Sequence, residues 1–65
     1  MKKYEAVQLM REGKKITHRH FSPEEWMTIQ DGKMLLEDGV KCSLPEFWKW
    51  RTDESWNDGY SLYGG

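Results

Sequence analysis

The sequence predicts an α+β domain in which one N-terminal amphipathic helix packs on a small antiparallel sheet of four to five strands, a β-meander. Three observations lead to this fold class. Apolar residues near the N-terminus recur at helical spacing, short runs of alternating residues follow, and acidic-glycine pairs separate these runs. The chain has 65 residues, which is enough for one domain with one small core. We therefore expect residues 1–65 to form a single α+β domain.

The first predicted element is a helix from Lys3 to Glu12. Its charged residues lie on one side and its apolar residues on the other; the apolar set is Ala6, Val7, Leu9 and Met10. Gly13 is suited to end the helix, because glycine adopts the left-handed conformation without steric cost. Arg11 lies in the last turn, where the negative end of the helix dipole favours a cation.

The next predicted elements are a strand over residues 15–21 and one helical turn after it. Alternation places Ile16, His18 and His20 on one side of the strand, and the β-branched residues of this run favour an extended backbone. Ser22-Pro23-Glu24-Glu25 then has the composition of a helix start, with a capping serine and a glutamate that completes the capping box. We expect a single helical turn there.

Asp31-Gly32 is the clearest hairpin signal in the chain. It predicts a two-residue turn between strands at residues 26–30 and 33–37. With this turn, the residue pairs on the core side of the sheet are Ile29 with Met34 and Met27 with Leu36.

Glu37-Asp38-Gly39 forms the second predicted turn, and its length decides which way the following strand faces. A two-residue loop would direct Val40 and Cys42 away from the core. A three-residue loop with Gly39 in the left-handed conformation directs them toward the core, beside Met34 and Leu36. We therefore expect the three-residue, bulged turn.

The rest of the chain predicts short elements. Ser43-Leu44-Pro45-Glu46 repeats the capping pattern over a short turn. Residues 47–51 alternate as a strand does, and a helical turn remains the alternative for them. Residues 52–59 are mostly polar and predict a loop, and residues 60–63 predict a last strand.

The charges are nearly balanced overall but unevenly distributed. The formal net charge is −1, yet residues 1–20 contain six basic and two acidic residues, and residues 21–65 contain four basic and nine acidic ones. Basic side chains near the first helix and strand can donate to an anion such as a nucleotide phosphate. The predicted anion- or nucleotide-binding residues are Arg11, Lys14, Lys15 and Arg19. A solvated basic corner is the alternative interpretation.

Aromatic residues are concentrated in the last third of the chain. Exposed Trp and Tyr side chains anchor interfaces and stack on bases. The predicted interface or stacking residues are Trp48, Trp50, Trp56 and Tyr60. Because small domains often gain stability by oligomerising, we expect a homo-oligomer. Packing of these rings in the core is the alternative.

Residues that would support catalysis or cofactor chemistry are sparse. Cys42 has no second cysteine for a disulfide, and His18, His20 and Cys42 form an incomplete ligand set for zinc. No nucleophile motif, phosphate loop or dinucleotide fingerprint is present. We expect no catalytic residues, no bound metal, no cofactor and no enzyme activity. The absence of a long apolar run predicts no membrane association and a cytoplasmic protein.

Several short motifs together resemble a group of small phage and prophage proteins. The motifs are Glu5-Ala6-Val7-Gln8-Leu9-Met10-Arg11-Glu12-Gly13-Lys14-Lys15-Ile16-Thr17, a Ser-Pro turn followed by Trp26, the turns Asp31-Gly32 and Glu37-Asp38-Gly39, and the terminal Asp58-Gly59-Tyr60-Ser61-Leu62-Tyr63. In that group a helix ending in E-G-K-K-[IV] leads to a basic strand, a meander and a final D-W-x-[IL]-Y strand. The opening run also resembles the Thoeris anti-defence sponge proteins of phages, which form oligomers that sequester cyclic nucleotide signals. This chain is shorter, with Phe21 where the sponge proteins tend to have Trp and Gly59-Tyr60 where they have Asp-Trp.

The resemblance implies a non-catalytic phage or prophage accessory protein that acts by binding in a bacterial host cell, in host-defence evasion by sequestering a nucleotide signal. Its partner is then a small nucleotide ligand or a host protein. The alternative is a protein–protein inhibitor whose acidic, aromatic C-terminal segment blocks a host nucleic-acid-binding protein. A third hypothesis is a small regulator that binds nucleic acid through the basic residues, although the near-neutral net charge argues against nucleic-acid binding.

Overall fold

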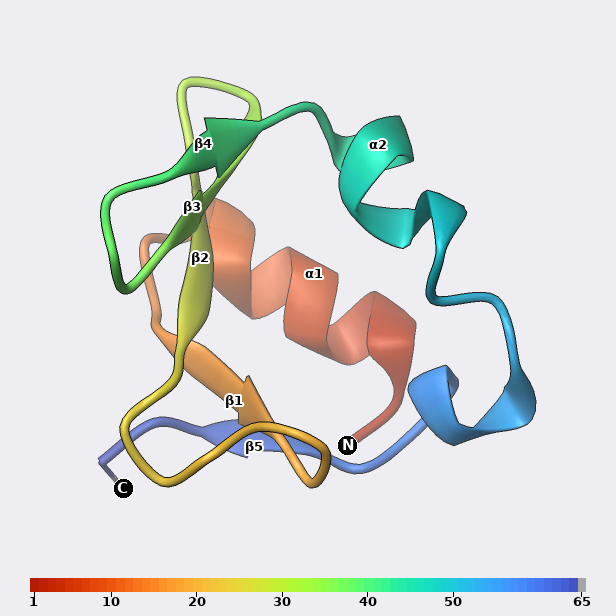
Figure 1. Ribbon diagram of the computed structural model, residues 1–65. Coiled ribbons are helices and arrows are strands. Elements are labelled where there is room, and N and C mark those ends of the chain that lie inside the picture. Colours follow the sequence, from red (N-terminus) through yellow and green to blue (C-terminus); the bar gives the residue numbers. More distant parts are fainter. Residues whose placement is uncertain (65) are drawn as a thin grey trace.

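The computed structural model describes residues 1–64, which form two helices, one short 3-10 turn and a five-stranded sheet (Figure 1). In chain order the elements are α1 (Lys3–Arg11), β1 (Ile16–His18), β2 (Met27–Gln30), β3 (Lys33–Leu36), β4 (Lys41–Cys42), α2 (Leu44–Lys49), the 3-10 turn η1 (Glu54–Trp56) and β5 (Tyr60–Leu62). The strand order is β4-β3-β2-β1-β5, and every neighbouring pair is antiparallel.

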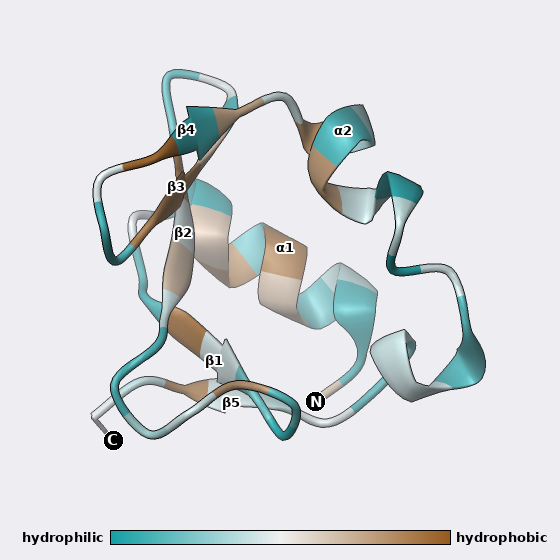
Figure 2. Ribbon diagram, viewed as in Figure 1, coloured by the Kyte–Doolittle hydropathy of each residue, from teal (hydrophilic) through white to brown (hydrophobic). Residues whose placement is uncertain are grey.

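The predicted fold class is confirmed, because α1 packs on this antiparallel sheet. The structure adds a second, short helix, α2. Figure 1 shows β2, β3 and β4 on one side of α1, and α2 and η1 on the other. Figure 2 shows hydrophobic residues along α1 and the strands beside it, whereas the turns are hydrophilic. The apolar sides of these elements therefore meet in one core.

α1 buries Ala6 and Met10 completely against the sheet. Glu5 accepts a hydrogen bond from the backbone N–H of Lys2 at 2.9 Å, which satisfies a donor at the start of the helix. Gly13 follows the helix with a φ of 89°, the left-handed conformation expected of the residue that ends it. The helix therefore begins and ends nearly as its sequence predicts.

β1 is shorter than the strand predicted over residues 15–21. The backbone N–H of Phe21 donates to the carbonyl of His18 at 2.8 Å and closes a turn, so the extended backbone stops at His18. His20 therefore lies outside the strand and is exposed. Residues 22–25 form one hydrogen-bonded turn in place of the expected helical turn, and in it the N–H of Glu25 donates to the carbonyl of Ser22 at 3.1 Å.

Both predicted hairpin registers are confirmed. Asp31 and Gly32 form a two-residue turn with φ values of 55° and 76°. The core-side pairs of β2 and β3 are Met27 with Leu36 and Ile29 with Met34. In the second turn the N–H of Leu36 donates to the carbonyl of Val40 at 2.9 Å, which leaves three loop residues ending at Gly39, whose φ is 88°. Met34 consequently pairs with Cys42.

Two expectations about the chain after this turn are wrong. Val40 is 50% exposed, because it lies before the two-residue edge strand β4 and not under the helices. Residues 47–51 do not form a strand, since α2 runs from Leu44 to Lys49. The helical alternative holds because the Oγ of Ser43 caps this helix, accepting from the N–H of Glu46 at 3.2 Å.

The core is formed by residues from both helices and four of the strands. Its buried hydrophobic members are Ala6, Met10, Ile16, Met27, Ile29, Met34, Phe47 and Tyr60. A buried polar residue, Thr28, ties the loop after α1 to β2, because its Oγ1 donates to the carbonyl of Lys14 at 2.8 Å. This contact fixes the position of α1 against the sheet.

Candidate functional site

α2 and the chain that follows it carry a group of aromatic rings. The rings of Phe47 and Trp48 are perpendicular with centroids 4.9 Å apart, and the rings of Trp48 and Tyr60 lie 6.3 Å apart. The hydroxyl of Tyr60 donates to the carbonyl of Trp56, which joins the fourth ring to the group. We call Phe47, Trp48, Trp56 and Tyr60 the aromatic cluster.

Two half-buried cations lie on the rings of this cluster. The Nζ of Lys3 is 4.1 Å from the ring centroid of Trp48. The Cζ of Arg51 is 4.0 Å from the ring centroid of Phe47 and 5.5 Å from that of Trp56. The Nη1 of Arg51 also donates to the carbonyl of Phe47 at 2.8 Å. Lys3 and Arg51 are thus held in place by π faces and one carbonyl.

Neither cation has a carboxylate partner within residues 1–64. The one ion pair found there joins the amino group of Met1 to Asp58, with N and O 3.7 Å apart. A lysine or arginine that is fully buried usually pairs with an acidic group, whereas a half-buried one packs its stem on apolar surface and keeps its charged end near water. The aromatic cluster therefore holds two positive charges that the described part of the chain does not neutralise.

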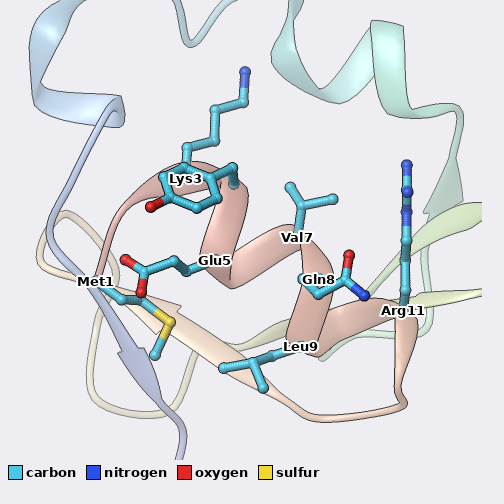
Figure 3. Close-up of a pocket in the computed structure, with 8 residues that line it drawn as sticks. Met1, Lys3, Glu5, Val7, Gln8, Leu9 and Arg11 are labelled. Atoms are coloured by element: carbon cyan, nitrogen blue, oxygen red, sulfur yellow. The ribbon is translucent and has the colours of Figure 1, made fainter.

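Lys3 also belongs to a hollow along α1. Residues three or four apart share one side of a helix, and Figure 3 shows Lys3, Val7 and Arg11 projecting from the same side of α1, with Leu9 on the opposite side. The hollow has a volume of about 740 Å³ and is lined mainly by apolar atoms of α1 and Met1. Its charged lining residues are Lys3, Arg11 and the acidic residue Glu5.

His18, the last residue of β1, is buried against the segment 55–58 and contacts the aromatic cluster. Its ring stacks on Trp56 with centroids 4.1 Å apart and planes 20° apart. Its Nε2 lies 2.9 Å from the carbonyl of Ser55 and 2.7 Å from that of Asp58, and its Nδ1 accepts from the N–H of His20 at 3.1 Å. Two acceptors at Nε2 and one donor at Nδ1 assign the neutral tautomer with the proton on Nε2.

Burial is the main reason that the pKa of His18 is lowered from its ordinary value of 6.5. The hydrogen bonds to the carbonyls of Asp58 and Ser55 act in the opposite direction, and the charges of His20 and Arg19 lower the pKa further. The neutral ring is therefore favoured in the folded protein.

Segment 55–59 is attached to the rest of the molecule through its carbonyl groups. Each of five consecutive carbonyls accepts a hydrogen bond: Ser55 and Asp58 from His18, Trp56 from Tyr60, Asn57 from the N–H of Lys3, and Gly59 from the N–H of Arg19. This run of bonds fixes Trp56 against His18. The position of the Trp56 ring is therefore determined by backbone contacts as well as by packing.

The four predicted interface residues have different surroundings. Trp48 and Trp56 are half-buried in the aromatic cluster, and Trp50 lies outside it with 78% of its side chain exposed. Tyr60 is only 3% exposed, and burial raises the pKa of its hydroxyl to about 12, so its ring is a core ring with no surface for a partner. Core packing, the alternative considered for these rings, thus holds for Tyr60.

The four predicted anion-binding residues are all exposed and lie in different parts of the fold. Arg11 lies on the hollow of α1, and Lys14 lies in the following loop. Lys15 lies before β1 with its Nζ 4.4 Å from the ring centroid of Trp26. Arg19 lies beyond the other end of β1, where its Nη2 donates to the carbonyl of Ser55 at 3.3 Å. The three-residue strand β1 separates Lys15 from Arg19.

Sequence reasoning missed Lys3 and Arg51. A helical reading of residues 44–49 would have placed Arg51 one turn beyond Phe47, which is the spacing at which helical neighbours meet. The same spacing relates Lys3 to Val7 and Arg11 on α1. Pairing α1 with α2, however, depends on tertiary contacts that the sequence does not display.

Residues 1–64 contain no group of three His, Cys, Asp or Glu side chains placed to hold a metal ion. Cys42 is a half-buried free thiol. Neither helix in this part of the chain is long and apolar enough to cross a membrane.

Comparison of the chain with protein-family models, with curated proteins and with solved structures gives no match.

Proposed function

We propose that this chain is a non-catalytic binding protein that holds a nucleotide-type ligand, an aromatic ring joined to phosphate, between α1 and the aromatic cluster. The observation that carries this proposal is the pair of half-buried cations, Lys3 and Arg51, each on an aromatic ring and each without a carboxylate partner in residues 1–64. A phosphate would supply the missing negative charge, and its oxygens accept from lysine and arginine donors.

The residues take separate roles in this proposal. Lys3 and Arg51 bind phosphate oxygens, and Arg11 adds a third positive charge on the same side of α1 as Lys3. The exposed part of the Trp48 ring stacks on the base. The predicted roles of Arg11 and Trp48 are kept, whereas Lys14, Lys15 and Arg19 lie outside the proposed site.

The biological role follows from the resemblance to phage and prophage proteins. A protein that binds a nucleotide signal without a reactive group removes the signal by sequestration and does not consume it. We propose that role, host-defence evasion inside a bacterial cell, for this chain. The apolar lining of the hollow beside Lys3 supports only the choice of ligand, because such a surface favours a ligand with a ring as well as a charge.

Isothermal titration calorimetry with a panel of linear and cyclic nucleotides tests the proposal. We expect at least one nucleotide to bind in the nanomolar to micromolar range. Lys3→Gln and Arg51→Gln should each weaken that binding by about 10-fold or more, because a hydrogen bond to a charged group contributes about 1.5–3 kcal/mol. Lys49→Gln is the matched control, since Lys49 also lies on an indole, that of Trp50, but outside the cluster.

Circular dichroism on each variant separates lost binding from lost structure, because Lys3 and Arg51 also pack on rings of the aromatic cluster. Absence of binding across the whole panel would overturn the proposal. So would equal weakening in the Lys49→Gln variant, because that result would indicate a general charge effect.

The exposure of Trp50 favours a second candidate function, inhibition of a host nucleic-acid-binding protein. Trp50 is 78% exposed, and Asp53 and Glu54 follow it in the sequence after Arg51, so this segment of the chain carries both an aromatic anchor and negative charge. A salt-sensitive protein captured from host lysate, and lost with Trp50→Ala, would support this function. Capture that is insensitive to salt and to this substitution would contradict it.

A further inference from the structure

His18 joins three parts of the molecule through one buried ring. It belongs to β1, its Nε2 donates to the segment 55–58, and its Nδ1 accepts from the N–H of His20. The carbonyl of His18 also accepts from the N–H of Phe21 at 2.8 Å. Residues 18–21 thus form a turn that is closed by two bonds, one to the ring of His18 and one to its backbone.

Proton accounting shows which of these bonds depends on pH. The neutral ring has one N–H, and it is on Nε2 because the two atoms facing Nε2 are carbonyl oxygens. A second proton must bind to Nδ1, whose lone pair already accepts from the N–H of His20. Two N–H donors would then face each other where the present separation is 3.1 Å. The contact between Nδ1 and His20 cannot survive protonation.

The geometry also shows which hydrogen bonds of the His18 ring persist when the ring is protonated. A charged His18 keeps its N–H on Nε2, so its bonds to Ser55 and Asp58 persist, and an imidazolium on the Trp56 ring is favoured as a cation on an aromatic face. Segment 55–59 has further bonds from Lys3 and Arg19. His20, in contrast, is exposed and has no other backbone bond within the turn.

We propose that residues 18–21 form an acid-sensitive switch, in which protonation of His18 releases the backbone of His20 while the N–H of Phe21 stays bonded to the carbonyl of His18 and segment 55–59 remains bound. Arg19 stays in place because its own N–H donates to the carbonyl of Gly59 at 3.1 Å. The moving part is therefore His20, at the tip of the turn. The His20 ring lies 5.2 Å from the Trp56 ring, so the release of His20 uncovers that edge of the aromatic cluster, while Phe21 keeps its backbone bond and its packing on the core.

The titratable and charged groups around His18 belong to its own turn, to β5 and to the segments packed on it. The His20 ring is 5.0 Å away and the Arg19 side chain is adjacent, and the Tyr60 ring lies 4.6 Å away on β5. On the opposite segment, the Asp58 carboxylate accepts from the N–H of Gly59 and lies near the Met1 amino group. Arg51 lies on Trp56. Because burial lowers the pKa of His18, the switch operates below pH 6.5.

NMR spectroscopy of the full chain between pH 7.5 and 4.5 tests the switch. Long-range ¹H–¹⁵N spectra report the protonation of the two ring nitrogens of His18, and amide spectra report the backbone. We expect the Nε2–H tautomer at pH 7.5. As His18 titrates, the amide signal of His20 should shift or broaden with the same midpoint, and by more than the signals of Phe21 and Ser22, while those of residues 55–59 change much less.

Two variants sharpen the result. His18→Gln cannot titrate in this range and should leave the amide of His20 independent of pH, whereas His20→Gln removes an exposed ring and should keep the wild-type behaviour. If His18→Gln does not fold, the wild-type titration alone decides. The proposal is overturned if His18 becomes charged while the amide of His20 stays unchanged. It is equally overturned if residues 55–59 are released first or if all amide signals disappear in one step.

Discussion

Gly59 has a φ of 90°, and a Cβ placed there would lie 3.0 Å from the Nε of Arg19. Gly13 has nearly the same φ, 89°, but open space around it. Gly13→Ala should therefore cost only the strain of a left-handed alanine, about 1–2 kcal/mol. Gly59→Ala should cost more, because the Arg19 side chain must also move and lose its bond to the Ser55 carbonyl. Urea denaturation of both variants measures the difference, and equal losses would contradict a role for the Arg19 contact.

His18 makes the free energy of unfolding depend on pH. Its pKa is lower in the folded protein than the ordinary value of 6.5, so between these two values the unfolded chain binds more protons. The stability that the neutral ring contributes is complete above pH 6.5 and is lost as the pH falls toward the folded pKa. For one proton the slope cannot exceed about 1.4 kcal/mol per pH unit. Urea denaturation at intervals from pH 7.5 to 5 measures it.

The variants used for the switch also control this measurement. His18→Gln should remove the slope in this range, and His20→Gln should retain it. Asp58 contributes in a different range, because its backbone bond from Gly59 lowers its pKa below the ordinary 3.8 and its stabilisation is lost only at more acidic pH. A wild-type stability that stays constant from pH 7.5 to 5 would contradict the buried, neutral His18.

At the scale of elements, two segments with similar start signals have different outcomes. Ser43 caps α2 through its Oγ, whereas residues 22–25 form only one turn, in which the N–H of Ser22 donates to the Glu25 carboxylate. Ser43→Ala should lower the free energy of unfolding by about 1 kcal/mol. Ser22→Ala should change it by less than half as much, because no helix N–H depends on that hydroxyl. Denaturation curves of the two variants test this, and similar losses would contradict the assignment.

The β-meander was predictable in detail because local chemistry determines it. Asp31-Gly32 adopts the two-residue turn that its positive φ angles require, and Gly39 ends a three-residue turn, so counting residues gives both registers. Residues 47–51 were mispredicted because alternation and helical spacing agree over so short a run, and the Ser43 cap decided between them. His20 was wrongly placed on a strand because a side chain, the Nδ1 of His18, takes its N–H.

At the scale of the whole molecule, the aromatic cluster was predicted in part. The sequence indicated three of its rings, those of Trp48, Trp56 and Tyr60, but not the two cations that lie on the cluster. Lys3 meets Trp48 from the other end of the chain, and no local pattern connects residues so far apart. The predicted anion-binding residues, Arg11, Lys14, Lys15 and Arg19, are close together in the sequence. Folding distributes them over the two ends of β1 and the side of α1.

Self-association remains a prediction for the whole molecule, and the structure identifies the surfaces on which to test it. A stable interface buries about 800 Å² per partner, a large share of the 4374 Å² that this chain exposes. The two most exposed large hydrophobic residues in the described part of the chain are Trp50, 78% exposed at the C-terminal end of α2, and Tyr4, 74% exposed on α1. Of these, Trp50 is the better anchor, because tryptophan is enriched among residues that dominate binding energy.

Native mass spectrometry of the wild type, Trp50→Ala and Tyr4→Ala decides between these surfaces. We expect a wild-type oligomer that Trp50→Ala converts to monomer at the same protein concentration, with Tyr4→Ala unaffected. The Trp50 ring is largely exposed, so its loss should leave the fold intact, whereas Trp56→Ala would remove the stack on His18 and confound the result. Loss of assembly in Tyr4→Ala alone would place the contact on α1. A monomeric wild type would contradict self-association, because Trp50 and Tyr4 would then both stay exposed to water in the intact protein.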